Sequence, residues 1–331
     1  MFLTKRLVFL FFILFSFLVS CNNDKEIDLN LKHLDHIAET INTDLATVKT
    51  EIITLGNILR YKIPFEKEVI WNVENKYHNY PGEILFSSYK KNQSAVYLPA
   101  NKKITEQLKK TILNTEQLDI SFNQIIKSNP LISQVYFLDT SSFLRIFPYI
   151  NVVNYLKNSI NLTELISFRT AQNKPFVLDH AYWVSQPFAD PFGRGWVISC
   201  IEPVYFRDRF IGITSGDISL YSLKSRYFTS NTEIMLIINQ EGEIICSTRE
   251  AAKLVNVPQY RDFQYFKPVT TDIFVFNSPS LLDHKNSNLR NAIKSLILGE
   301  RKDVFYINNE KYTIYKSEIR ETNWFLLKVI N

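Results

Sequence analysis

An aspartate ends an apolar, alternating segment in the middle of the chain. Residues 211–217 read Ile-Gly-Ile-Thr-Ser-Gly-Asp, and the period of two in a β-strand places Asp217 on the face of Ile211 and Ile213. A carboxylate on such a face needs a partner, because burying an unpaired charge is costly. The partner is either a cationic group of a bound molecule or the backbone amides at a strand end. The segment therefore makes Asp217 a candidate ligand contact, with a purely structural role as the alternative.

Other polar and aromatic residues of the same region are candidate contacts. Arg145 could offer a forked pair of donors to a ligand carboxylate, although a solvated strand arginine is the alternative. Asp190 precedes a proline, so it either contacts a ligand or caps its own turn. Aromatic walls suit small, partly apolar ligands, and for each aromatic residue core packing is the competing role. The candidate wall residues are Tyr136, Phe147, Tyr149, Phe168, Tyr182 and Trp183.

The sequence contains no pattern typical of an enzyme, a cofactor site or a metal site. None of the eight glycines forms a phosphate-binding loop, no Gly-x-Ser-x-Gly elbow occurs, and the five histidines include no His-Glu-x-x-His pair. His33 and His36 share a helix face at i, i+3, but a solvated face is favoured over a metal site. The net charge of +5 is a mild excess that predicts no nucleic-acid partner. We therefore expect no catalysis and no cofactor.

The N-terminus has the layout of a signal peptide. Lys5 and Arg6 precede an apolar run over residues 7–18, which is shorter than the roughly 20 residues that a membrane-spanning helix needs. Residues 18–21 read Leu-Val-Ser-Cys, which resembles the lipobox of bacterial lipoproteins. The resemblance implies a signal peptide over 1–20, a lipidated Cys21 and a tether over 21–26. A plain secretory signal is the alternative.

One long amphipathic helix is expected over residues 27–62. Its apolar residues alternate in steps of three and four, and Pro64 disfavours helical geometry in the residue before it. This stripe can pack on the protein's own domains, or against a second copy as a coiled coil that would make a homodimer. The stripe consists of Leu31, Leu34, Ala38, Ile41, Leu45, Val48, Ile52, Leu55 and Leu59.

The rest of the chain predicts an α+β protein with two mainly antiparallel sheets, each covered on one face by helices and loops. A helix is expected over 104–127, a hairpin over 131–149, and strand-rich text over 175–220 with breaks at 190–195 and 207–209. The second half repeats this order more briefly. It has a hairpin over 233–247, a helix over 289–298, and strands over 303–307, 311–319 and 324–330. Cys200 and Cys246 stand in apolar, strand-like text, where two buried thiols and one disulfide are both compatible with the sequence.

Residues 182–220 resemble a double Cache domain, the PAS-like extracytoplasmic sensor of many bacterial chemoreceptors and histidine kinases. The resemblance lies in Tyr-Trp-Val-Ser-Gln-Pro-Phe-Ala-Asp-Pro over 182–191, Gly-Trp-Val-Ile-Ser over 195–199, Pro-Val-Tyr over 203–205, and Gly-Ile-Thr-Ser-Gly-Asp-Ile-Ser-Leu over 212–220. It implies a membrane-distal module over 63–220 that holds a ligand pocket, and a membrane-proximal module over 221–331. Family pockets use an aspartate that matches Asp217 to hold a ligand's ammonium group.

The resemblance implies a lipid-anchored, extracytoplasmic sensory protein, on the periplasmic face or the cell surface, that binds a small molecule and acts through a separate membrane signalling partner. An amine, an amino acid and a carboxylate all remain open as ligand classes. Residues 165–169, Leu-Ile-Ser-Phe-Arg, lack the first arginine of the Arg-x-Trp-Tyr pattern of amino-acid-binding members, which puts amino-acid recognition in doubt. The competing function is a surface-exposed structural or interaction lipoprotein that displays loops and binds no solute.

Overall fold

A computed structural model describes most of the chain as two compact units. The described residues are 3–72, 76–79, 84–156, 160–173, 180–230, 232–257 and 278–331, with side chains of the N-terminal helix described from Leu29 onward. Residues 43–229 form the eight-stranded unit. Residues 230–257 and 279–331, together with the N-terminal part of the first helix up to Asn42, form the five-stranded unit.

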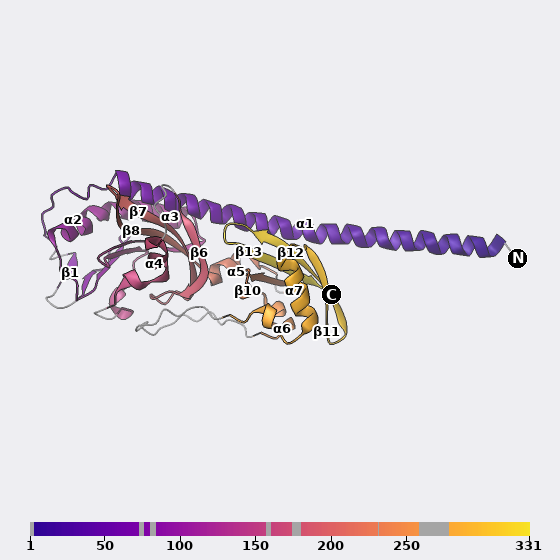
Figure 1. Cartoon of the computed structure of the whole chain (residues 1–331). Helices are drawn as coiled ribbons and strands as arrows, with labels where there is room; N and C mark the ends of the chain where they lie inside the picture. The colour runs from indigo at the N-terminus through magenta and orange to yellow at the C-terminus, as the bar shows by residue number, and fades with distance from the viewer. Residues whose placement is uncertain are drawn as a thin grey trace. The chain divides into compact units, whose positions relative to one another are not determined.

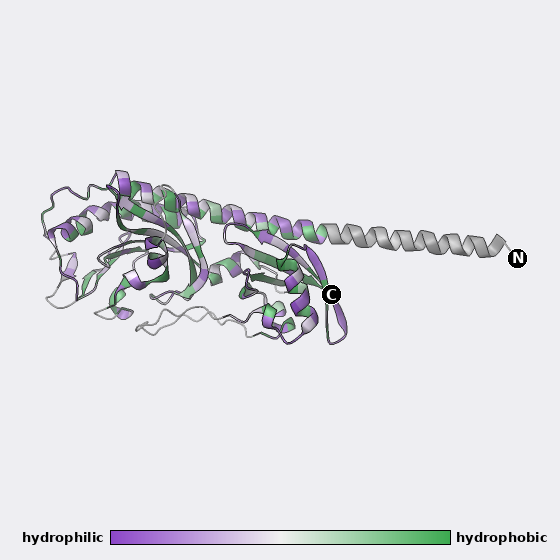
Figure 2. Cartoon of the chain, in the orientation of Figure 1, coloured by the Kyte–Doolittle hydropathy of each residue, from purple (hydrophilic) through white to green (hydrophobic). Residues whose placement is uncertain are grey.

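Helix α1 spans Leu3–Tyr61 and contributes to both units. It begins earlier than the predicted start at residue 27, and the sequence offers no proline or glycine between Leu3 and Leu55 that would interrupt it. The predicted stripe from Leu34 to Leu59 is buried, with each side chain at most 1% exposed. The stripe therefore packs within the chain, and a homodimer would have to use another surface. Figure 2 shows the described part of α1 alternating between apolar and polar residues.

The eight-stranded sheet is antiparallel throughout, with the order β1-β2-β3-β5-β4-β8-β7-β6 (Figure 1). Its strands are β1 Tyr77–Asn79, β2 Leu85–Ser87, β3 Ala95–Leu98, β4 Ile132–Asp139, β5 Leu144–Phe147, β6 Tyr182–Ala189, β7 Trp196–Phe206 and β8 Arg209–Ser219. The predicted hairpin and the three predicted strands after it are confirmed. Arg207 and Asp208, both with positive φ, form the two-residue turn between β7 and β8.

Strand register divides the side chains of this sheet between two faces. Tyr136 pairs with Ser215 and with Ile146, so these three share what we call the Asp217 face, which also holds Gln134 and Asp217. Their neighbours Val135, Phe137, Arg145, Thr214 and Gly216 lie on the opposite face, here called the Arg145 face.

Different helices cover the two faces. The Arg145 face packs against α1, α2 and α3, whereas the Asp217 face is covered by the short 3₁₀ turns η2 Val152–Asn154 and η3 Leu162–Glu164 and by α4 Ile166–Gln172 (Figure 1). Phe168 of α4, Val152 and Leu162 join the strand residues in one buried apolar cluster. The fold thus makes a second layer on each side of the sheet.

The predicted helix over 104–127 is interrupted. The structure has α2 Glu106–Asn114, the 3₁₀ turn η1 Thr115–Gln117, and α3 Leu118–Ser128. Thr105 caps α2, since its Oγ1 accepts a 3.2 Å bond from the amide of Leu108. At the break, the hydroxyl of Thr115 donates to the carbonyl of Thr111 at 2.7 Å, and the buried Arg145 takes the carbonyl of Ile112. Side chains thus occupy carbonyls at the point where the regular helix stops.

The five-stranded unit contains the antiparallel sheet β10-β9-β13-β12-β11. Its elements are β9 Ile234–Ile238, β10 Ile244–Ser247, α6 Arg249–Leu254, η4 Leu281–Asp283, α7 Ser287–Ile297, β11 Lys302–Ile307, β12 Glu310–Ile319 and β13 Trp324–Ile330, and α5 Leu220–Tyr227 precedes them in the chain. The predicted hairpin, helix and three closing strands are confirmed. Cys200 and Cys246 are buried thiols that form no disulfide.

Candidate functional site

Asp217 lies near the end of β8 with its carboxylate inside a ring of polar side chains. The residue is 2% exposed. Its Oδ2 accepts a 2.6 Å hydrogen bond from Nε2 of Gln134 on β4, the residue directly opposite in the register. Its Oδ1 accepts bonds from the hydroxyls of Ser199 at 2.5 Å and Ser215 at 3.2 Å. Three strands therefore fix this carboxylate, and its partners are side chains rather than the backbone amides that the structural alternative required.

Asp190 joins the same cluster from the turn after β6. Its Oδ1 accepts a 3.0 Å bond from Nε2 of Gln134, and its Oδ2 accepts a 3.0 Å bond from the amide of Arg194. Asp190 thus caps its own turn, as one of the sequence alternatives expected, and also faces Asp217 across one amide group. Gln134 is 1% exposed, and its Oε1 has no hydrogen-bond partner within the described part of the chain. Flipping the Gln134 amide would point its oxygen at two carboxylates. The side chain therefore keeps this orientation, in which Oε1 has no hydrogen-bond donor.

The cluster holds more negative than positive charge when both carboxylates ionise. Burial, together with the neighbouring charge of Asp190, raises the pKa of Asp217 to about 7, although the hydrogen bonds from Ser199, Gln134 and Ser215 act in the opposite direction. Burial likewise raises the pKa of Asp190. Burial lowers the pKa of Arg194, while both carboxylates oppose that change. The Arg194 guanidinium donates to the backbone carbonyls of Ser133 and Pro148, at 3.3 Å for the latter. One further cation or proton is needed to neutralise the group.

Four of the predicted aromatic residues lie on the side of the sheet that holds Asp217. Tyr136, Phe168 and Tyr182 belong to the buried cluster there, together with Ile201 and Ile213. The hydroxyl of Tyr136 lies 3.3 Å from that of Ser167, which precedes Phe168 in α4. Tyr149 is partly buried against the same cluster, and its hydroxyl donates to the carbonyl of Ser87 at 3.0 Å. The structure therefore gathers these four aromatic side chains on the side of the sheet that holds Asp217.

Phe147 and Trp183 lie elsewhere. Phe147 pairs with Val135, on the Arg145 face, and Trp183 pairs with Cys200, one residue out of phase with Tyr182. Since side chains alternate along a strand, neither residue shares the face of Asp217.

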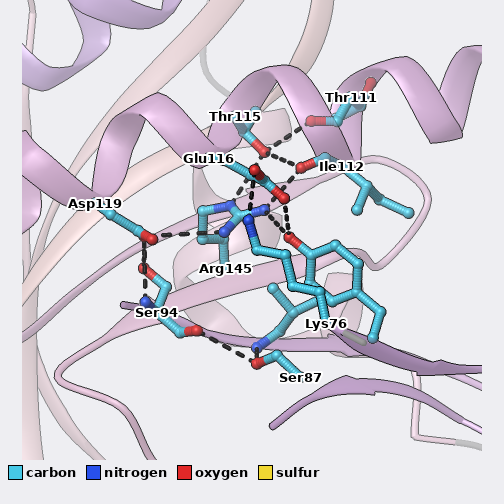
Figure 3. Close-up of polar contacts among 11 residues, drawn as sticks. Lys76, Ser87, Ser94, Thr111, Ile112, Thr115, Glu116, Asp119 and Arg145 are labelled. Carbon is cyan, nitrogen blue, oxygen red and sulfur yellow. Dashed lines mark hydrogen bonds and ion pairs between the residues drawn. The ribbon is translucent and has the colours of Figure 1, made fainter. Parts of the chain in front are cut away.

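Arg145 is also separated from Asp217, because it lies on the opposite face of the sheet. It is 2% exposed, and its donors bond Oγ1 of Thr115 at 3.1 Å, the phenol of Tyr77 at 3.2 Å and the carbonyl of Ile112 at 2.7 Å (Figure 3). Asp119 lies 3.8 Å from its Nη1. Burial by itself lowers the pKa of Arg145, but the neighbouring Tyr77 and Asp119 more than offset this, so the pKa is raised. The guanidinium of Arg145 is therefore bonded to groups of the protein itself.

Four members of the site were not predicted from the sequence, namely Gln134, Ser199, Ser215 and Arg194. The sequence contains a signal for Gln134, because it is a polar residue two positions before Tyr136, in a strand that is apolar from Val135 to Leu138. Nothing in the sequence links Ser199 or Arg194 to Asp217, since strand order places them there. The described chain also forms cavities away from this site, of about 310 and about 400 Å³, and neither is lined by Asp217.

The described residues contain no cluster of side chains that would hold a metal ion, and none of their helices is both long and apolar enough to cross a membrane. The side chain of Cys21 lies outside the described residues, so its predicted lipidation stays a prediction.

No protein-family model matches the sequence, and no curated protein matches it either. Solved structures do match. The ligand-binding domain of the amino acid chemoreceptor PctB of Pseudomonas aeruginosa, in complex with L-Arg, is 11% identical with a TM-score of 0.54 over 93% of this chain and 96% of that one. The chain has the fold of chemoreceptor sensory domains.

Two further structures agree with this Cache-like sensory fold. The sensory domain of the Campylobacter jejuni chemoreceptor Tlp3, with isoleucine bound, is 12% identical with a TM-score of 0.51 over 92% of this chain and 94% of that one. An extracellular domain assigned to a histidine kinase, soHK1S-Z6, is 12% identical with a TM-score of 0.56 over 93% and 94%. The predicted α+β fold class is thereby confirmed. The matched domains are sensory rather than catalytic.

Proposed function

We propose that this protein is an extracytoplasmic sensory protein that binds a small molecule at the Asp217 cluster. The observation that carries the proposal is a pair of buried carboxylates, Asp217 and Asp190, which share one amide of Gln134 while the other side of that amide has no partner in the described chain. Native proteins rarely leave a buried acceptor unsatisfied, and such atoms call for a functional explanation. A ligand that donates hydrogen bonds supplies one.

The charge of the cluster favours a ligand with an ammonium group. An ammonium carries three donors and one positive charge, which matches one unpaired amide oxygen and the net negative charge left after Arg194 is counted. Tyr136, Phe168, Tyr182 and Tyr149 then supply apolar contact for the rest of the molecule. The amino acids bound to PctB and Tlp3 also carry ammonium groups, which supports this class. Amines and amino acids thus stand ahead of simple carboxylates, for which this face presents Arg194 but not Arg145.

A thermal-shift screen tests the proposal. Amines, amino acids and carboxylates are added to the mature protein, and a ligand at 100 times its dissociation constant adds about 2.7 kcal/mol of stability. We expect an ammonium-bearing compound to raise the melting temperature, and Asp217→Asn to remove the rise. Asp44→Asn is the control, because the Asp44 carboxylate accepts hydrogen bonds from Arg226 and Tyr227 and lies outside the Asp217 cluster.

Two outcomes would count against this function. One is the absence of any shift across the library, which would favour the display scaffold, in which the protein's own side chains fill the space beside Asp217. The other is a library in which every observed shift survives Asp217→Asn.

We further propose that the protein is held to a membrane by lipid on Cys21 and passes ligand occupancy to a separate membrane partner. Acyl chains contribute roughly 0.8 kcal/mol per buried methylene, so two or three chains suffice for anchoring. Cells fed with a clickable fatty acid should label the wild-type protein and not the Cys21→Ser variant, which should also leave the membrane fraction. Equal labelling of both proteins would contradict the anchor without affecting the binding site.

A further inference from the structure

A cavity of the eight-stranded unit lies at the end of β4 away from Gln134. It has a volume of about 310 Å³, at the lower end of the range of small-molecule sites, and four phenylalanines line it, namely Phe65, Phe137, Phe206 and Phe210. Asp139, the last residue of β4, also lines it. Asp139 is five residues beyond Gln134, roughly 17 Å along the strand. The cavity is therefore distinct from the Asp217 cluster.

Asp139 brings one uncommitted carboxylate oxygen to this cavity. Its Oδ1 accepts two 2.8 Å bonds, from the amides of Ser141 and Phe143. No hydrogen bond to its Oδ2 exists among the described residues, although the residue is only 6% exposed. The turn thus uses one oxygen and leaves the other for a different partner.

The walls of the cavity consist of aromatic rings, and the other charged residues that line it are either paired or exposed to solvent. The ring of Phe65 lies 5.7 Å from that of Phe206, edge to face, and 6.5 Å from that of Phe137. Glu66 is engaged with Arg207, whose Nη1 lies 2.8 Å from Oε1 of the glutamate. Arg209 lines the cavity but is an exposed residue, so its charge is solvated.

We propose that this cavity is a second ligand site, which takes a small organic amine with its ammonium group on Oδ2 of Asp139 and its apolar part among the phenylalanines. A carboxylate and aromatic rings both attract a cation, and the rings also bury an apolar body. The proposal does not rest on the Asp217 cluster, because the two sites share no residue.

Binding at this site depends on pH. Burial raises the pKa of Asp139 to about 7, with the amides of Phe143 and Ser141 and the charge of Lys102 acting in the opposite direction. The other charges at the cavity are Glu66, paired with Arg207, and the exposed Arg209. An ammonium ion binds the ionised carboxylate, so its affinity falls as the pH drops below about 7 and levels off above it.

Isothermal titration of the mature protein with 2-phenylethylamine tests the site, and 2-phenylethanol is the uncharged comparison. We expect the amine to bind at least tenfold more tightly than the alcohol at pH 8. Asp139→Asn should weaken amine binding at least tenfold, whereas Asp217→Asn should leave this binding event unchanged. Asparagine retains the oxygen that accepts the two turn bonds, so this variant preserves the local structure.

Phe206→Leu provides a second variant, which shortens the apolar wall while every charged residue stays in place, and it should weaken amine binding several-fold. Equal affinities for the amine and the alcohol, or amine binding unaffected by Asp139→Asn, would overturn the second site. A signal lost in Asp217→Asn and kept in Asp139→Asn would do the same, while supporting the function proposed above.

Discussion

Gln134 joins two buried carboxylates that would otherwise repel each other. Its single amide nitrogen donates to Asp217 at 2.6 Å and to Asp190 at 3.0 Å, which uses both of its hydrogens. This leaves the amide oxygen buried and unsatisfied in the described chain, a loss typically worth about 1–3 kcal/mol. A protein that keeps such a cost in its free form can recover it when a donor binds, which is why this residue supports a ligand site better than any single aromatic residue does.

The raised pKa of Asp217 predicts how stability depends on pH. The pKa is about 7 in the folded protein and 3.8 ordinarily, so between these values the folded state holds a proton that the unfolded state releases. Stability should therefore fall as the pH rises from about 4 to about 7 and then level off. Urea unfolding at pH 5 and pH 8 measures this, and Asp217→Asn should show a smaller difference than the wild type. Equal differences in the two proteins would contradict the buried, proton-binding carboxylate.

Gly212 of β8 lies so close to the backbone of β4 that no side chain fits at this position. Its φ is +153°, and a Cβ built there would lie 2.3 Å from the carbonyl oxygen of Leu138. Backbone atoms cannot move aside cheaply, so Gly212→Ala should lower the free energy of unfolding by about 2 kcal/mol or more. Gly299→Ala is the control, because Gly299 also has a positive φ but has no atom within 4 Å. Chemical denaturation of both variants decides the point, and equal losses would show that the close approach is unimportant.

At the scale of elements, Arg145 holds the broken helix to the sheet. The residue comes from β5, and its partners come from β1, the end of α2 and the turn η1 (Figure 3). It thus ties three short elements to one buried cation. We assign it a structural role, in place of the ligand contact expected from the sequence.

Arg145→Met tests this role. Removing the guanidinium leaves the phenol of Tyr77, the hydroxyl of Thr115 and the carboxylate of Asp119 with fewer partners. We expect the free energy of unfolding to fall by about 3–5 kcal/mol, the range found when one member of a buried ion pair is removed. Arg145→Lys should recover little of the loss, because one ammonium cannot span the same set of acceptors. Ligand affinity, measured at a temperature where both variants are folded, should not change. A folded variant that loses ligand affinity would show that Arg145 belongs to the binding site.

The sequence predicts the elements well where a periodic pattern continues long enough. The stripe of α1 and the strands β4 to β13 follow from such patterns. The strands β1 to β3 were missed, since they are three or four residues long and stand in an aromatic-rich stretch without alternation. The helix break at 115–117 was also missed, because its cause is Arg145, thirty residues away in the chain. Placing Gln134 and Ser199 beside Asp217 required the strand order, which no local pattern contains.

At the scale of the whole molecule, the same fold occurs in proteins whose sequences differ widely from this one. Domains that are 11–12% identical to this chain match more than nine tenths of it. Packing requires only apolar side chains at the buried positions of both sheets, and many sequences satisfy that requirement. Figure 2 shows that apolar residues recur along the strands of both sheets and are interspersed with polar ones. Function then depends on a few polar residues, such as those around Asp217, and these must be tested one by one.

A crystal structure of the protein with its best thermal-shift ligand tests the central claim most directly. We predict a bound molecule whose ammonium nitrogen lies within about 2.7–3.2 Å of the carboxylate of Asp217 or of Oε1 of Gln134. A structure in which the protein's own side chains occupy all the space beside these two residues, with the ligand elsewhere or absent, would contradict the account.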